Sequence, residues 1–154
     1  NWLDAFERVY LAFSIAPWTR RVVRATQKAR KMYLLDYPVI DDPAARFENM
    51  VAVELLRAVS MWNDLGHGTF GLHFVRNKEK EEVDCRQPEN SRPQGRGESK
   101  MSDTKFAPSL RTCQDQRGVP AVQVTNEGRT VRRVSNGRHS ILVALASMWL
   151  PRLP

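Results

Sequence analysis

Residues 42–63 read DPAARFENMVAVELLRAVSMWN, and this stretch decides the fold class. Asp42 can cap the free amide groups at the start of a helix, and Pro43 suits the first helical position. Apolar side chains then recur at steps of three and four residues, which is typical of a helix with one buried face. They are Phe47, Val51, Leu55, Val59 and Trp62. The pattern predicts a helix from Asp42 to about Asn63, with Glu48 at the edge of its buried face.

Strand signals stand on both sides of this helix. The expected strands are Met32 to Leu35, Leu72 to Asn77, Glu82 to Cys85, Val119 to Val124, Arg129 to Val134 and Ile141 to Val143. Further helices are expected from Phe106 to Gln116 and around Met148 to Leu150. Residues 86–97 are nearly devoid of apolar side chains, so they are either a hairpin or a loop. The whole pattern predicts an α/β fold, a mixed central sheet flanked by helices.

The amino-terminal part of the chain has a different character. Apolar and aromatic residues at helical spacing predict an amphipathic helix from Trp2 to Phe13 with a buried aromatic stripe, and Pro17 follows its end. Basic residues with no acidic residue between them come next: Arg20, Arg21, Arg24, Lys28, Arg30 and Lys31. This cluster can contact the phosphates of a nucleic acid, and a solvated linker explains it equally well.

Composition narrows the class of protein. The chain has 154 residues, enough for one main core, and carries 24 Lys and Arg against 17 Asp and Glu, a formal net charge of +7. This charge favours polyanionic partners, either nucleic acid or an anionic membrane surface. The longest apolar stretch, Ile141 to Leu150, is too short to cross a bilayer, so we expect a cytoplasmic protein. Cys85 and Cys113 form no CxxC pair, and we interpret both as free thiols.

The residues that can carry chemistry are Glu48, Asp84, Glu98 and Lys100. If Glu82 to Cys85 and Glu98 to Lys100 are neighbouring strands, Glu98 and Lys100 share a face and Asp84 can meet them. The two carboxylates of Asp84 and Glu98 can hold Mg²⁺ or Mn²⁺, which stabilises charge at a phosphodiester and lowers the pKa of bound water. A lysine ammonium beside them can orient water or the developing anion. On spacing alone, a solvated charge pattern explains these residues better.

Four motifs in order resemble a known family. Residues 31–36 (KMYLLD), 46–51 (RFENMV), 79–84 (EKEEVD) and 98–103 (ESKMSD) resemble the carboxy-terminal domain of prokaryotic AAA-type ATPases. In that family a domain of unknown function, similar to PD-(D/E)XK nucleases, follows an ATPase module and a winged helix. The resemblance spans most of residues 1–154.

The resemblance implies a restriction-endonuclease-like domain over residues 31–154, preceded in residues 1–30 by the end of a winged helix and a basic linker. It implies that Glu48 is the helical acid, Asp84 the strand acid, and Glu98 with Lys100 the paired motif. It also implies DNA and the chain's own upstream ATPase module as partners, with ATP bound only in that module. Because the chain opens at Asn1 without a Met, we expect a carboxy-terminal fragment.

The sequence departs from the family pattern in the strands that would carry the site. Where the family has bulky apolar residues, this chain has Cys85, Arg86 and Gln87 on one strand and Arg96 and Gly97 on the other. Burial of each missing side chain would contribute about 1.5 to 3 kcal/mol to stability. We therefore predict a weak or inactive nuclease.

The sequence is compatible with three hypotheses about function. The first is a metal-dependent, nuclease-like domain acting on DNA. The second is a non-catalytic domain that binds nucleic acid, and the third is an interaction domain that docks the ATPase on a protein partner. His67, His73 and His139 lack the spacing of a zinc protease and are taken as ordinary surface or core residues. The oligomeric state is left open.

Overall fold

The computed structural model describes residues 2–17, 30–76, 81–86, 95–102, 121–128, 131–136 and 139–154. For 75, 76, 81–86, 95–102, 136 and 139 it describes the backbone alone. The elements in chain order are α1 Trp2–Arg8, β1 Ala12–Pro17, β2 Lys31–Leu34, η1 Tyr37–Val39, α3 Pro43–Asp64, β3 Gly71–Arg76, β4 Glu81–Arg86, β5 Gly95–Ser102, β6 Ala121–Glu127, β7 Arg132–Asn136, β8 His139–Leu145, α5 Ala146–Trp149 and η2 Leu150–Arg152.

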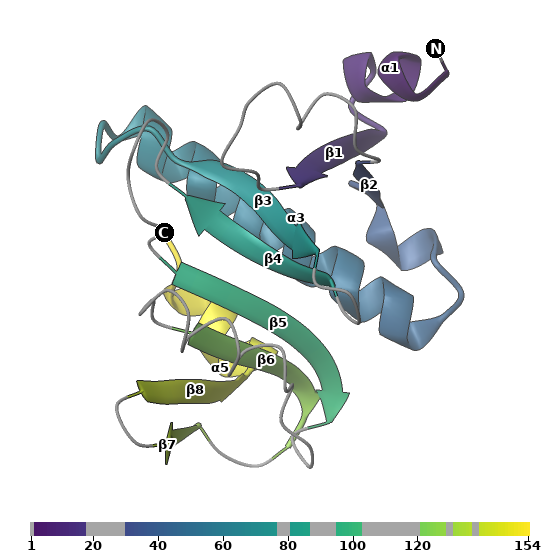
Figure 1. Ribbon diagram of the computed structural model, residues 1–154. Coiled ribbons are helices and arrows are strands. Elements are labelled where there is room, and N and C mark those ends of the chain that lie inside the picture. Colours follow the sequence, from purple (N-terminus) through teal and green to yellow (C-terminus); the bar gives the residue numbers. More distant parts are fainter. Residues whose placement is uncertain are drawn as a thin grey trace.

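These strands form one sheet in the order β2-β1-β3-β4-β5-β6-β8-β7 (Figure 1). The pairs β1/β3, β5/β6 and β6/β8 are parallel, whereas β1/β2, β3/β4, β4/β5 and β7/β8 are antiparallel. The sheet is therefore mixed, and the predicted α/β class is confirmed. The finer expectations, a restriction-endonuclease-like topology and a preceding winged helix, stay predictions.

Helix α3 begins as the sequence predicts. The Asp42 carboxylate accepts hydrogen bonds from the backbone amides of Ala44 at 2.7 Å and Ala45 at 3.3 Å. The helix ends where Gly66 takes a left-handed conformation with φ of 74°, which glycine adopts without strain. The amides of Gly66 and His67 then donate to the carbonyls of Asn63 and Trp62, so the last turn is closed by backbone hydrogen bonds.

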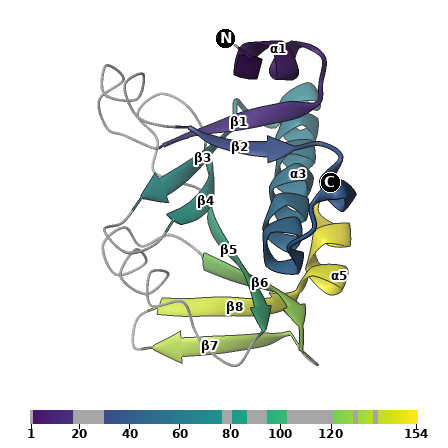
Figure 2. The ribbon, with the colours of Figure 1, turned by 90° about the vertical axis from the view of Figure 1, so that its right-hand side faces the viewer.

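Helices α3 and α5 cover the same face of the sheet (Figure 2). Two groups of buried side chains fill the space between them and the strands. The first consists of Phe47, Val51, Leu55, Val124, Ala146 and Leu150. The second consists of Ile15, Tyr33, Ala52 and Phe74. The face of α3 that the sequence predicts to be buried is therefore the one that meets the sheet.

The second face of the sheet is also covered at β6. Val124 packs on the α3 side, and its neighbours Gln123 and Thr125 belong to the other face because side chains alternate along a strand. Both are buried, with exposed fractions of 0% and 1%. The helix expected from Phe106 to Gln116 lies outside the described residues.

The prediction of one helix from Trp2 to Phe13 is wrong. The helix ends at Arg8, and Tyr10 takes a left-handed conformation with φ of 56°. From Ala12 the chain is a strand that pairs with both β2 and β3, so the sheet includes residues before position 31. The reason is that Phe13, Ile15 and Pro17 alternate with smaller residues, a period of two that the longer helical spacing concealed.

The buried aromatic stripe expected on this helix is wrong too. None of the residues of α1 is buried, and Trp2 is 80% exposed. Tyr10, which follows the helix, is 81% exposed. The helical spacing of these apolar residues therefore does not correspond to a core face.

The remaining strand predictions agree with β2, β3, β4, β6, β7 and β8 within a few residues at each end. Of the two alternatives for residues 86–97, the antiparallel pairing of β4 with β5 favours the hairpin, although 87–94 lie outside the described residues. The basic residues Arg20, Arg21, Arg24 and Lys28 also lie outside them. Lys31 belongs to β2 and not to a linker.

Candidate functional site

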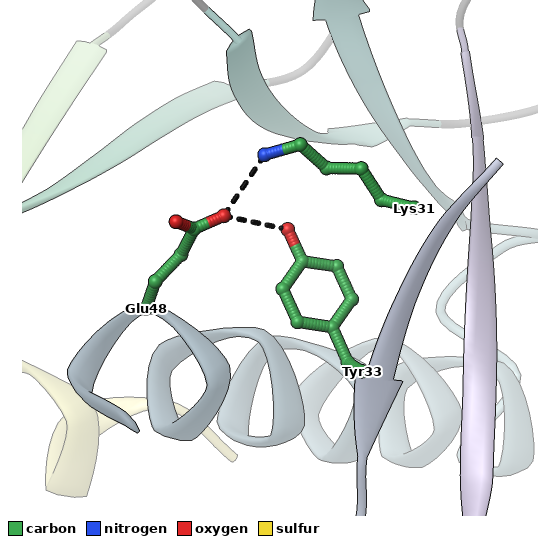
Figure 3. Close-up of polar contacts among 3 residues, drawn as sticks. All are labelled: Lys31, Tyr33 and Glu48. Carbon is green, nitrogen blue, oxygen red and sulfur yellow. Dashed lines mark hydrogen bonds and ion pairs between the residues drawn. The ribbon is translucent and has the colours of Figure 1, made fainter. Parts of the chain in front are cut away.

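Glu48 is the candidate site residue whose surroundings the structure describes most fully. Its Oε1 accepts hydrogen bonds from Lys31 Nζ at 2.9 Å and from the Tyr33 hydroxyl at 3.0 Å (Figure 3). The Glu48 side chain is 42% exposed and that of Lys31 is 18% exposed. The carboxylate thus lies at the edge of the buried face of α3, as predicted, and forms an ion pair with the adjacent strand.

The sequence of β2 explains why both partners reach Glu48. Lys31 and Tyr33 are two residues apart on a strand, so they share the face that meets α3. Asn49, buried and next to Glu48, holds this strand in register with the helix. Its Oδ1 accepts from the Leu34 amide at 2.9 Å, and its Nδ2 donates to the Leu34 carbonyl at 2.5 Å. Together these bonds fix β2 on α3.

Tyr33 has an unusual environment. Burial raises the pKa of its hydroxyl well above the ordinary value, and the charge of Glu48 and the hydrogen bond to it raise the pKa further. The hydroxyl therefore stays protonated and acts as a hydrogen-bond donor. The ring stacks on Phe13 with centroids 5.6 Å apart, and Lys31 Nζ lies 6.0 Å from the ring centroids of Tyr33 and Phe74.

The strand acids are positioned by the pairing of β4 with β5. Asp84 pairs with Arg96 in this antiparallel ladder. Residues directly opposite each other share a face, and so do residues two apart on one strand. Asp84 therefore occupies the same face of the sheet as Glu98 and Lys100, on the neighbouring strand. The structure brings these three positions together at the level of the backbone.

This face is the one turned away from α3. Phe74 packs against Ala52 of α3 and pairs with Val83, so Asp84, one residue along, belongs to the opposite face. On β5, Ser99 pairs with Val124, which packs on the α3 side. Glu98 and Lys100, the neighbours of Ser99, therefore belong to the face turned away from α3.

Glu48, by contrast, approaches the sheet from the α3 side, where its described partners are on β2. A cluster of Glu48 with Asp84, Glu98 and Lys100 stays a prediction.

The sequence predicts His73 to be an ordinary surface or core residue, yet it pairs directly with Asp84 in the β3/β4 ladder. The residue is half-buried, and its Nδ1 is shielded from solvent. The signal in the sequence is that His73 stands between the apolar Leu72 and Phe74, so it must share the other face. Tyr33 and Asn49 were missed because their roles depend on how β2 docks on α3.

Of the predicted nucleic-acid-binding residues, the structure describes Arg30 and Lys31, and their surroundings differ. Arg30 is exposed, and its guanidinium donates to the hydroxyl of Ser14 at 3.0 Å. The charge of Lys31 is compensated by Glu48. Arg30 is therefore better placed than Lys31 to contact a polyanion.

A cavity of about 370 Å³ lies between α3 and the C-terminal helices. Its lining includes Met50, Glu54, Arg57, Ser147 and Leu150. Arg57 Nε is 2.9 Å from Glu54 Oε2, so the two charges compensate each other. None of the predicted site residues lines this cavity.

Two features are absent from the part of the chain that the structure describes. Among the described side chains, no group of three or more His, Cys, Asp or Glu residues could hold a metal ion. Within the same residues, no helix is long and apolar enough to span a membrane.

Comparisons with known proteins add no identification. No family model matches the chain, and neither a curated protein nor a solved structure is significantly similar to it. The resemblance to the carboxy-terminal domain of AAA-type ATPases therefore rests on the motifs in the sequence.

Proposed function

We propose that this chain is a nuclease-like, DNA-associated domain of an AAA-type ATPase, with a divalent-metal site at Asp84 and Glu98 and little or no phosphodiester hydrolysis. The observation that carries the proposal is the register of β4 and β5. Asp84 pairs with Arg96, so that Asp84, Glu98 and Lys100 share one face on neighbouring strands. This register supports a site that combines the strand acid with the paired motif.

The residue types suit the chemistry. Carboxylate oxygens are the ligands that Mg²⁺ and Mn²⁺ prefer, and a bound cation would stabilise negative charge at a phosphodiester. Lys100, two residues from Glu98, would hold a phosphate or a water beside it. The net charge of +7 favours a polyanionic substrate.

Two features support weak or absent cleavage. A catalytic constellation must be held within about 0.5 Å of its productive geometry by packed supporting residues. Gly97 and Cys85 take the positions that face α3 on the two strands, where larger apolar side chains would give that support. In addition, Glu48 forms an ion pair with Lys31, so its carboxylate has a structural role.

Calorimetric titration with Mn²⁺, run beside a cleavage assay on single- and double-stranded DNA, tests the proposal. We expect Mn²⁺ binding that is lost in Asp84→Asn and kept in Glu127→Gln, a control that removes an exposed strand carboxylate. Cleavage should be barely detectable, and any that occurs should disappear in Lys100→Ala. Unchanged Mn²⁺ binding in Asp84→Asn would remove the metal site.

A second candidate function is favoured by the surroundings of Glu48. Because Lys31 and Tyr33 hold this acid, the domain would keep the fold and charge of a nuclease while binding DNA without cutting it. DNA binding that falls with salt and needs no metal would support this function over the first. Absence of both DNA binding and metal binding would leave the third alternative, docking on a protein partner.

A further inference from the structure

The strand β3 contributes a third group to the face that carries Asp84 and Glu98. His73 pairs with Asp84 across the antiparallel β3/β4 ladder, as Asp84 pairs with Arg96 across β4/β5. These three positions form one row across neighbouring strands. Glu98 is two residues after Arg96 on β5, so it occupies the same face of the sheet as this row.

The spacing of this row suits a shared cation. Cβ atoms of directly opposite residues lie about 4.5 to 5.5 Å apart, and diagonal neighbours about 7 to 8 Å apart. His73 and Glu98 lie on the two strands that flank β4, so an ion shared by all three residues would lie above Asp84, with the imidazole and the longer carboxylate reaching it from opposite sides.

The donor set would decide which metal binds. Mg²⁺ prefers oxygen ligands and keeps its waters, whereas an imidazole nitrogen favours first-row transition metals. We propose that His73 is a ligand of the metal site formed with Asp84 and Glu98, and that it selects Mn²⁺ or a similar transition metal over Mg²⁺. This inference rests on the proposed function, because it needs the metal site at Asp84 and Glu98.

The test measures metal binding by the whole 154-residue chain, with Mn²⁺ and Mg²⁺ alone as probes. His73→Phe keeps an aromatic ring and removes both nitrogens, and His73→Gln serves if the first variant does not fold. His67→Phe is the matched control, because His67 is exposed in the turn after α3. The His73 variants should lose about tenfold or more in Mn²⁺ affinity, and Mg²⁺ affinity should change little. The control should bind both metals as the wild type does.

A second measurement needs no variant. Pulsed electron paramagnetic resonance of bound Mn²⁺ should show coupling to a histidine nitrogen in the wild-type chain. Absence of that coupling, or equal Mn²⁺ affinity in wild type and the His73 variants, overturns the role of His73. If Asp84→Asn still loses Mn²⁺ in that case, the proposed metal site stands without the histidine. If Asp84→Asn also binds normally, the proposed site itself fails.

Discussion

The ammonium of Lys31 lies 2.9 Å from Oε1 of Glu48, and the same oxygen accepts a hydrogen bond from Tyr33. A residue expected to contact DNA is thus bound to a residue expected to serve catalysis. The pair joins β2 to α3 across 17 positions of sequence, so it contributes to the tertiary structure. The contribution of this pair to the free energy of unfolding, and the effect of Glu48 on the ionisation of Tyr33, can both be measured.

A double-mutant cycle should show that this pair stabilises the fold. Glu48→Gln and Lys31→Met should each lower the free energy of unfolding by about 1 kcal/mol, since each removes a charge-assisted hydrogen bond of 2.9 Å between part-buried groups. The coupling energy between them should be about 1 kcal/mol, measured by urea unfolding. Glu54 and Arg57 are also 2.9 Å apart, but Arg57 is 46% exposed where Lys31 is 18% exposed, so they form the control pair, with an expected coupling below about 0.5 kcal/mol. Equal coupling in the two pairs would contradict a special role for Glu48.

Stability should depend on the ionisation of Tyr33 at high pH. Its pKa in the folded chain is raised above the unfolded value of about 10, so above that pH the unfolded chain loses a proton that the folded chain keeps. The stabilisation is therefore fully present below about pH 10 and is lost as the pH rises further, by up to about 1.4 kcal/mol per pH unit. The stability advantage of wild type over Tyr33→Phe should shrink by about 1 kcal/mol between about pH 9 and pH 11. A difference that is constant with pH would show that Tyr33 ionises in both states alike.

The parts of the fold that the sequence predicted are those with local causes. Asp42 and Pro43 define the start of α3 by a cap and a fixed backbone angle, and Gly66 defines its end through a left-handed conformation. The error at the amino end has a different cause, because local patterns conflict there. Helical spacing from Trp2 to Phe13 overlapped with strand alternation from Ala12, and pairing with β2 decided between them.

The candidate site was less predictable, because it depends on register. That Asp84 and Glu98 can share a face followed from their spacing once β4 and β5 were taken as neighbours. The pairing of His73 with Asp84, and the contact of Lys31 with Glu48, depend on which elements dock together. Local sequence cues do not specify such long-range contacts.

DNA affinity should depend on the basic segment before β2 more than on Lys31. Replacing Arg20, Arg21 and Arg24 together by Gln should weaken binding and reduce the slope of log affinity against log salt, by about 0.9 for each phosphate that is no longer neutralised. Lys31→Gln should change the slope little, because Glu48 already compensates that charge. Fluorescence anisotropy with duplex DNA between about 50 and 200 mM salt measures both. An unchanged slope in the triple variant would remove this segment from the DNA interface.

The last prediction concerns the two strands that carry the proposed metal site. Position 97 on β5 lies between Val83 and Val122 in the sheet, and Val122 packs against the cluster beneath α3. Glycine at such a position contributes no side chain to the core and costs backbone entropy. Cys85, on β4, pairs with Leu72, which packs against the same cluster.

Gly97→Val and Cys85→Leu should each raise the free energy of unfolding by about 1 kcal/mol, by restoring apolar burial on the α3 side. Arg133→Val, at an exposed position of β7, tests strand propensity alone and should change stability by less than about 0.5 kcal/mol. Because Asp84 and Glu98 are next to the filled positions, the double variant should also bind Mn²⁺ more tightly than wild type. Lower stability in both single variants would mean that this side of the sheet is already filled, and weak cleavage would then need a cause other than poor packing.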